Sequence, residues 1–257
     1  MPDTRLVLLD RDGAVAWLTL NEPEARNPLS PGLVDQLTDH LRGLADDEDI
    51  RVVILTGAGR GFCAGADLRR MRSATPLEDR DEYDSILVLN RTLWEYPKPT
   101  IAAVHGFAMG AGANLMSWCD LVVIDENARV GYPEVRAGVP SATVVPTLMR
   151  TLGRKRMYEL LLTGDPITAT EAHQLGLVNQ VAPAGEGMTY ARKLAARIEA
   201  HNPSAIRLTK EIVKVTTDMP YHQALEYAKD LRVIARLRTD FSVKISQGGQ
   251  AAREVAP

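Results

Sequence analysis

The sequence has few cysteines and no excess of basic charge. Cys63 and Cys119 are the only two cysteines among 257 residues. Two are too few for the disulfide framework of a secreted scaffold, so we expect a reducing, cytoplasmic environment. The 30 Lys and Arg residues face 33 Asp and Glu residues, which gives a formal net charge of −3. Because no basic excess is available to neutralise phosphates, the charge balance argues against nucleic acid as a general partner.

Long apolar runs are also missing. The most apolar stretch, residues 101–116, contains His105 and Asn114 and is shorter than the roughly 20 residues that cross a bilayer. The N-terminal segment carries Asp3 and Asp10, where a signal peptide needs a basic start and an unbroken apolar core. We therefore expect no membrane segment and no export. The histidines show no metal-ligand spacing, so no metal site is expected either.

The composition suits a globular protein, with 45% hydrophobic and 25% charged residues. Strand-like runs such as RVVILTG, TIAAV and LVVID alternate with helical patterns, which predicts an α/β unit with right-handed crossovers. Beyond GLVNQV every periodic segment is helical. The sequence therefore predicts an α/β core over residues 1–183 and a helical region over residues 184–257.

Individual elements have recognisable starts and ends. A turn at Asp12-Gly13 predicts an opening hairpin. Ser30 followed by Pro31 predicts the start of an amphipathic helix. The remaining helices are predicted over residues 76–96, 190–200, 203–216 and 220–245.

Two glycine-rich turns, each following a predicted strand, are the candidate site. The first, GAGRGFCAGADL, begins like a dinucleotide-binding turn, but Phe62 stands where the third glycine belongs. The hypothesis of an oxidoreductase that uses NAD(P) therefore rests only on Gly57 and Gly59. The second, HGFAMGAGANL, opens a helix. Ala66 and Ala111 leave the peptide N–H groups of the two turns unhindered, so the turns predict an oxyanion hole, unless the glycines serve only tight turns.

At these turns the chain resembles the crotonase, or enoyl-CoA hydratase/isomerase, superfamily. The resemblance runs from about residue 5 to residue 245 through four motifs in the family's order. The motifs are GRGFCAGADL, KPTIAAVHGFAMGAGANL, CDLVVIDENARVGYPEVRAGVP and LLTGDPITATEAHQLGLVNQVAP. The resemblance implies a core of ββα spiral turns whose C-terminal helices form homotrimers or hexamers that are dimers of trimers. It also implies an acyl-CoA thioester substrate and no separate cofactor, because coenzyme A is part of the substrate.

The resemblance assigns roles to residues at both turns. It makes the peptide N–H groups of Ala66 and Ala111 the donors to the thioester oxygen, with Gly110 opening the second helix. It places the coenzyme A moiety along the first turn and a basic residue of the preceding loop. The implied substrate-binding residues are Arg26, Ala64, Gly65, Asp67, Leu68 and Gly110. Two of these have an alternative interpretation. Arg26 is also compatible with a solvated surface residue, and Asp67 with the N-cap of a helix beginning at Leu68.

The catalytic pattern of the family is only half present. Typical hydratases of the family carry two glutamates twenty residues apart, and here these positions hold Asn114 and Glu134. One carboxylate suffices for hydration if it takes a proton from water and passes it to the α-carbon. It also suffices for an isomerase that moves a double bond, and a catalytically silent acyl-CoA binder remains a third alternative.

Other readings of these two residues stay open. Asn114 either holds a water or substrate group or packs within its helix, and Glu134 alone would suit the first turn of a helix. The segment EVRAGVPSATVVPTLMR resembles 3-methylglutaconyl-CoA hydratases more than the glycine-rich PGAGGTQRL of ordinary hydratases, which favours hydration. The pocket wall is expected around residues 70–90 and from Val139 to Pro146.

Overall fold

The computed structural model describes residues 5–67 and 75–238. These residues form two compact units, divided between Glu199 and Ala200. The last strand, β11 (Gln180–Ala182), ends next to the division expected at residue 183. The helices that follow begin with α8 (Gly187–Glu199), which belongs to the first unit because it packs on the central sheet.

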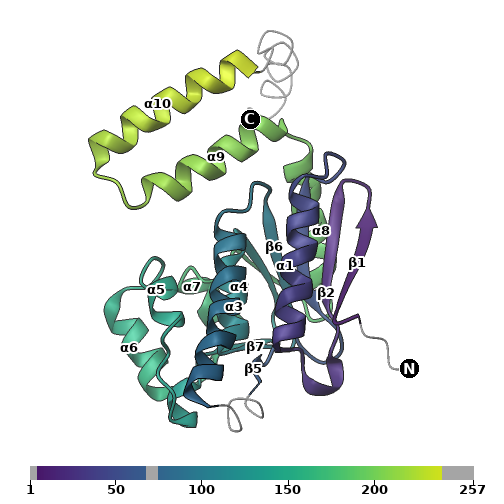
Figure 1. Cartoon of the computed structure of the whole chain (residues 1–257), viewed down its shortest axis with the longest axis vertical. Helices are drawn as coiled ribbons and strands as arrows, with labels where there is room; N and C mark the ends of the chain where they lie inside the picture. The colour runs from purple at the N-terminus through teal and green to yellow at the C-terminus, as the bar shows by residue number, and fades with distance from the viewer. Residues whose placement is uncertain (1–4, 68–74, 239–257) are drawn as a thin grey trace. The chain divides into compact units, whose positions relative to one another are not determined.

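A six-stranded sheet lies at the centre of the first unit (Figure 1). Its strands, in spatial order, are β1 (Val7–Asp12), β2 (Val15–Leu20), β4 (Val52–Gly57), β6 (Thr100–Val104), β8 (Leu121–Asp125) and β11. The β1–β2 hairpin is antiparallel, as expected, and every other pairing is parallel. Parallel strands covered on both faces require near-continuous apolar sequence, and all six residues of β4 are buried.

The two faces of the sheet have separate cores. Because side chains alternate along a strand, Val53 and Leu55 of β4 face one side and Val52 and Ile54 face the other. The first side packs against α1 (Pro31–Ala45), α3 (Pro76–Trp94) and α4 (Ala111–Trp118). The second side packs against α8, whose Ala191 and Ala195 are fully buried.

Several short elements surround the site. Two small sheets, β10–β9–β7 and β3–β5, have strands of only two or three residues, so the sequence shows no period from which to predict them. Their strands are β3 (Pro28–Leu29), β5 (Gly65–Ala66), β7 (Phe107–Met109), β9 (Arg129–Gly131) and β10 (Ile167–Thr168). The short helices are α5 (Val144–Leu148), α6 (Arg154–Thr163) and α7 (Ala169–Gln174), with 3₁₀ turns η1 (Pro23–Ala25) and η2 (Glu134–Ala137).

The predicted start of α1 is confirmed, because the Ser30 hydroxyl accepts a hydrogen bond from the Leu33 N–H. The second unit contains α9 (Pro203–Thr216) and α10 (Tyr221–Arg238). The part of the predicted last helix beyond Arg238 lies outside the described residues. In the described part of the chain, no helix combines the length and apolar character that a membrane span requires.

Asn27 joins the loop after β2 to the loop after β4. It is fully buried, and its φ of 52° lies in the left-handed region that asparagine tolerates. Its Nδ2 lies 2.9, 3.0 and 3.2 Å from the carbonyl oxygens of Ala58, Gly61 and Phe62. Its Oδ1 accepts from the Glu22 N–H at 2.9 Å. One amide therefore contacts four backbone groups, with its two N–H donors shared among three carbonyl oxygens, and holds the strand-to-turn path that leads to β5.

Replacing Asn27 by Ala should destabilise the protein by about 3 kcal/mol, because it leaves buried backbone groups without partners. For a chain of this size the expected fall in Tm is about 6–10 °C, measurable by calorimetry. Asn21→Ala is the control, because it removes one surface hydrogen bond to the Arg5 carbonyl and should change Tm little. Equal Tm values for the two variants would contradict the structural role of Asn27.

Candidate active site

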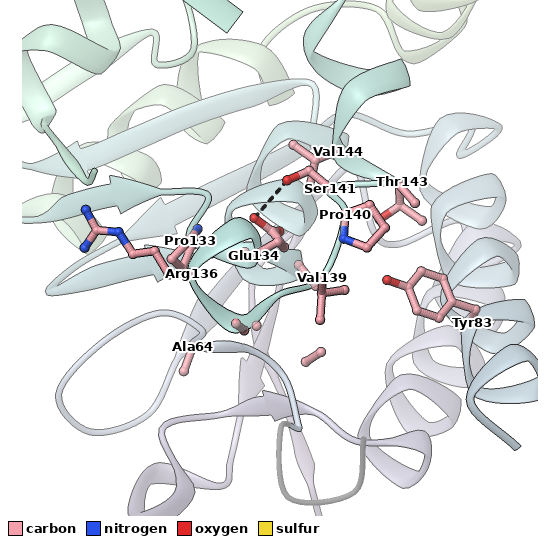
Figure 2. A pocket seen from close by; sticks show the side chains of 16 residues that line it. Ala64, Tyr83, Pro133, Glu134, Arg136, Val139, Pro140, Ser141, Thr143 and Val144 are labelled. Carbon is pink, nitrogen blue, oxygen red and sulfur yellow. Dashed lines mark hydrogen bonds between the residues drawn. The ribbon is translucent and has the colours of Figure 1, made fainter. Parts of the chain in front are cut away.

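A cavity of about 360 Å³ opens where the two glycine-rich turns meet the segment after β9 (Figure 2). It brings together six residues that the sequence analysis singled out: Ala64, Gly65, Ala66, Gly110, Ala111 and Glu134. The expected wall is also present, since Tyr83 of α3 and the segment Val139–Val144 line the cavity. The remaining lining residues are Pro133, Arg136 and Ala137.

The two turns approach each other too closely for side chains. A Cβ on Gly65 would lie 2.7 Å from the Met109 carbonyl oxygen, and one on Gly112 would lie 2.5 Å from the Cys63 carbonyl oxygen. A hydrogen bond from the Met109 N–H to the same Cys63 oxygen, 3.0 Å long, joins the turns directly. Glycine at these positions therefore brings β5 and the start of α4 to one side of the cavity.

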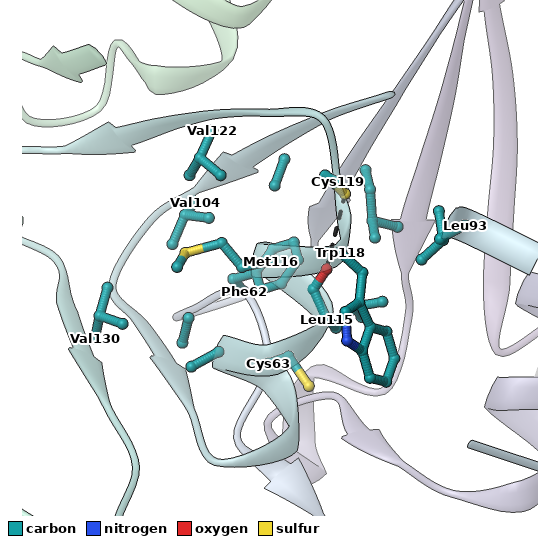
Figure 3. Packing of buried hydrophobic residues seen from close by; sticks show 14 of the residues in the cluster. Phe62, Cys63, Leu93, Val104, Leu115, Met116, Trp118, Cys119, Val122 and Val130 are labelled. Atoms are coloured by element: carbon teal, nitrogen blue, oxygen red, sulfur yellow. Dashed lines mark hydrogen bonds between the residues drawn. The ribbon is translucent and has the colours of Figure 1, made fainter. Parts of the chain in front are cut away.

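The inner side of this junction is apolar. Figure 3 shows Phe62 and Cys63 of the first turn packed with Leu115 and Met116 of α4. All four side chains are fully buried. Burial raises the pKa of the Cys63 thiol to about 12, so this cysteine is a buried structural residue.

Glu134 is the ionisable group at the centre of the cavity (Figure 2). It follows Pro133 at the start of η2, and its Oε2 accepts a hydrogen bond from the Ser141 hydroxyl at 3.3 Å. A Cβ on Gly110 would lie 3.3 Å from Oε1, so the other carboxylate oxygen faces the beginning of α4. Burial raises the pKa of Glu134, although hydrogen bonds from its own N–H and from Ser141 act in the opposite direction. A carboxylate with a raised pKa is suited to proton transfer near neutral pH.

Asn114 lies behind the cavity and is not among its lining residues. It is fully buried in α4, and its Nδ2 donates to the Thr143 carbonyl at 3.1 Å. Its buried Oδ1 has no hydrogen-bond partner among the described residues. The side chain thus ties α4 to the Val139–Val144 wall.

Not all of the residues expected to hold coenzyme A line the cavity. Arg26 is exposed at the end of η1 and does not line the cavity, but its carbonyl accepts from the Ala64 N–H at 3.0 Å. Asp67 is half-buried directly after β5, and Leu68 lies outside the described residues. Asp120 is structural, because its carboxylate accepts hydrogen bonds from both the N–H and the hydroxyl of Thr100.

The sequence analysis did not single out three residues that shape this site. Asn27 hydrogen-bonds to backbone groups that are distant in the sequence, and Ser141 hydrogen-bonds to a side chain on another turn. Tyr83 lies on a charged helix that has little distinctive pattern. The available signals were the segment 139–146 as an expected wall and the contrast of PSATVVPTL with a glycine-rich family motif. Neither signal identifies a hydrogen-bond partner for Glu134.

The described core, the parallel crossovers and the cavity together define an α/β protein of the crotonase fold class. Solved enoyl-CoA hydratase structures share this fold. The structure from Bacillus anthracis has a TM-score of 0.90 at 31% identity, covering 97% of this chain and 96% of that chain. The structure from Mycobacterium smegmatis has a TM-score of 0.89 at 31% identity, covering 96% of each.

The sequence comparisons agree. The family model for enoyl-CoA hydratase/isomerase matches residues 10–248. A Thermus thermophilus protein named "Putative enoyl-CoA hydratase" is 46% identical over 204 residues, covering 78% of this chain and 81% of the relative. The 2,3-dehydroadipyl-CoA hydratase of Escherichia coli is 37% identical over 233 residues, covering 88% of both. The chain belongs to the enoyl-CoA hydratase/isomerase family, and the family implies an acyl-CoA substrate, so the resemblance drawn from the four motifs is confirmed.

Gly112→Ala should separate the two turns, because its Cβ meets backbone and side-chain atoms of Cys63. We expect a loss of about 1–3 kcal/mol of stability from overpacking. Gly43→Ala is a matched control in another helix, since a Cβ there meets nothing within 4 Å. That substitution should stabilise the protein by about 0.5–1 kcal/mol through helix propensity. Denaturant titrations of both variants measure the difference, and a neutral Gly112→Ala would contradict the close-contact argument.

Proposed function

We propose that the protein is a hydro-lyase that adds water to an α,β-unsaturated acyl-CoA thioester. The observation that carries the proposal is one partly buried carboxylate, Glu134, in a cavity that Ala66 and Ala111 also line. In this proposal the thioester oxygen accepts hydrogen bonds from the peptide N–H groups of Ala66 and Ala111. These donors stabilise the negative charge that the oxygen gains as the enolate forms.

Glu134 is the single proton-transfer group of the proposed reaction. Its carboxylate takes a proton from water while the water oxygen bonds to the β-carbon and the electrons of the double bond move into the enolate. The resulting carboxylic acid then returns that proton to the α-carbon on the same face. The sum of the two steps is addition of H and OH, and no cofactor is consumed. The raised pKa of Glu134 supports both steps, because the group must accept a proton and release it again.

The coenzyme A moiety is proposed to lie along the first turn. Arg26 is exposed and lies outside the cavity lining, which suits contact with a phosphate. Its carbonyl accepts a hydrogen bond from the Ala64 N–H of the first turn. The proposed contacts are Arg26, Ala64, Gly65, Asp67, Leu68 and Gly110.

A double-bond isomerase is the second candidate. It needs one carboxylate, and Glu134 is the carboxylate among the described lining residues, while the Asn114 amide is engaged with the Thr143 carbonyl. The activity of the 2,3-dehydroadipyl-CoA hydratase relative favours hydration instead. A catalytically silent acyl-CoA binder is the third candidate, and it predicts binding without turnover.

A homotrimer, or a hexamer built as a dimer of trimers, is proposed for the assembled protein, in the cytoplasm. Support for assembly comes from apolar side chains left exposed on α9 and α10, including Val213, Leu225 and Val233. The cytoplasmic location is supported by two buried cysteines that are both free thiols. Light scattering on the eluting protein should give three or six times the chain mass of 28.1 kDa. A particle of one chain mass would contradict the assembly.

The reaction type is tested with crotonyl-CoA, a 3-enoyl-CoA and 3-methylglutaconyl-CoA in ¹⁸O-labelled water. Hydration predicts a 3-hydroxyacyl-CoA that carries one ¹⁸O, identified by mass spectrometry. A shifted double bond without ¹⁸O would establish the isomerase, and unchanged thioesters with tight binding would establish the silent binder.

Glu134→Gln should lower kcat by about 10²- to 10⁴-fold, because the amide cannot accept the proton. For the unaltered enzyme, activity should fall as the pH drops through the raised pKa of Glu134, since protonation removes the base. The acidic limb should therefore lie above the ordinary glutamate range. Acyl-CoA binding by the Gln variant, measured by calorimetry, is the control and should be nearly unchanged. Turnover by that variant equal to the unaltered rate would remove Glu134 from the mechanism.

A further inference from the structure

We propose that Ser141 is a positioning residue for the reaction, holding one oxygen of Glu134 so that the other faces the substrate. The inference rests on the proposed function of Glu134. Ser141 lines the same cavity, and its hydroxyl lies 3.3 Å from Glu134 Oε2 (Figure 2). Among the described residues, this is the side chain that hydrogen-bonds to the carboxylate.

Backbone hydrogen bonds on both sides of Ser141 hold the segment that carries its hydroxyl. The Val139 N–H donates to the Glu134 carbonyl at 3.1 Å, which closes the loop between the two residues. The Ser141 carbonyl accepts from the Val145 N–H at 3.2 Å at the start of α5. Asn114 also holds this wall through the Thr143 carbonyl. The hydroxyl is therefore presented by a fixed segment rather than by a freely moving loop.

The two oxygens of Glu134 consequently have different surroundings. Oε2 is held by Ser141, whereas Oε1 lies on the side of Gly110, at the start of α4. A serine hydroxyl has one proton to donate and two lone pairs. When the proton is used on Oε2, a lone pair remains to accept a hydrogen bond from a water molecule in the cavity. Ser141 can thus orient the base and the water together.

Two residues of this chain distinguish the surroundings of Glu134. Ser141 supplies a hydroxyl to the carboxylate, and Asn114, which carries no carboxylate, holds the same wall through the Thr143 carbonyl. The hydrogen bond also opposes the effect of burial on the pKa of Glu134, because it stabilises the charged form.

The test compares Ser141→Ala with Ser141→Thr on the enoyl-CoA that the unaltered enzyme turns over. Ser141→Ala removes the hydroxyl, so kcat should fall about tenfold while KM changes less than about twofold. The acidic limb of the kcat profile should move up by about one pH unit, because the bond that favours ionised Glu134 is lost. Ser141→Thr keeps the hydroxyl and should restore both values. Thr92→Val is the matched control, since it removes a remote hydroxyl bonded to the Val88 carbonyl of its own helix.

A direct titration separates this inference from the proposed function. In protein carrying [δ-¹³C]glutamate, the Glu134 signal is assigned by its loss in Glu134→Gln, and its chemical shift is followed with pH. Ser141→Ala should raise this pKa whichever reaction the enzyme catalyses. An unchanged Glu134 pKa in Ser141→Ala would overturn the inference, as would equal losses of kcat in the Ala and Thr variants. Failure of hydration with a shifted Glu134 pKa would overturn the proposed reaction and leave the hydrogen bond established.

Discussion

The close approach of two backbone turns is the constraint on which this site depends. Gly65 and Gly112 lie where a Cβ would fall within 2.7 Å of a carbonyl oxygen of the opposite turn. Such contacts have no room for any other residue, so the separation of the turns is set by backbone atoms and not by side-chain size. The cavity residues of both turns, Ala64–Ala66 and Gly110–Ala111, are placed by this junction. The apolar packing of Cys63 against α4 holds the junction rigid from behind.

This construction separates anion stabilisation from proton transfer. Peptide groups carry no formal charge and do not titrate, so in the proposed mechanism their contribution at the thioester oxygen is independent of pH. The titratable group, Glu134, comes from a different segment, η2, and lines the same cavity. The pH dependence of the reaction can therefore be adjusted at Glu134 and its neighbours without disturbing the donors. The hydrogen bond from Ser141 is one such adjustment in this chain.

The sequence predicts the fold and much of the site for identifiable reasons. Buried parallel strands require continuous apolar runs, so RVVILTG is recognisable as β4. The glycines of the two turns are recognisable because tight backbone contact excludes other residues. Asn27 and Ser141 were missed because their partners depend on loop paths that no periodicity encodes. Asn114 was recognised by position, but only the structure shows that its amide bonds to the Thr143 carbonyl.

The engagement of Asn114 also bears on why one fold supports several reactions. A residue at that position can reach the Val139–Val144 wall, and here the Asn114 amide donates a hydrogen bond to the backbone of that wall. In the proposed mechanism the proton transfers are then left to Glu134, whose two oxygens are already distinguished by Ser141 and Gly110. A change at either position would alter how many groups can bind water, while the glycine junction and the central sheet stay the same. Under this proposal the reaction type depends on the hydrogen-bond partners of the carboxylate, which lie outside the packed core.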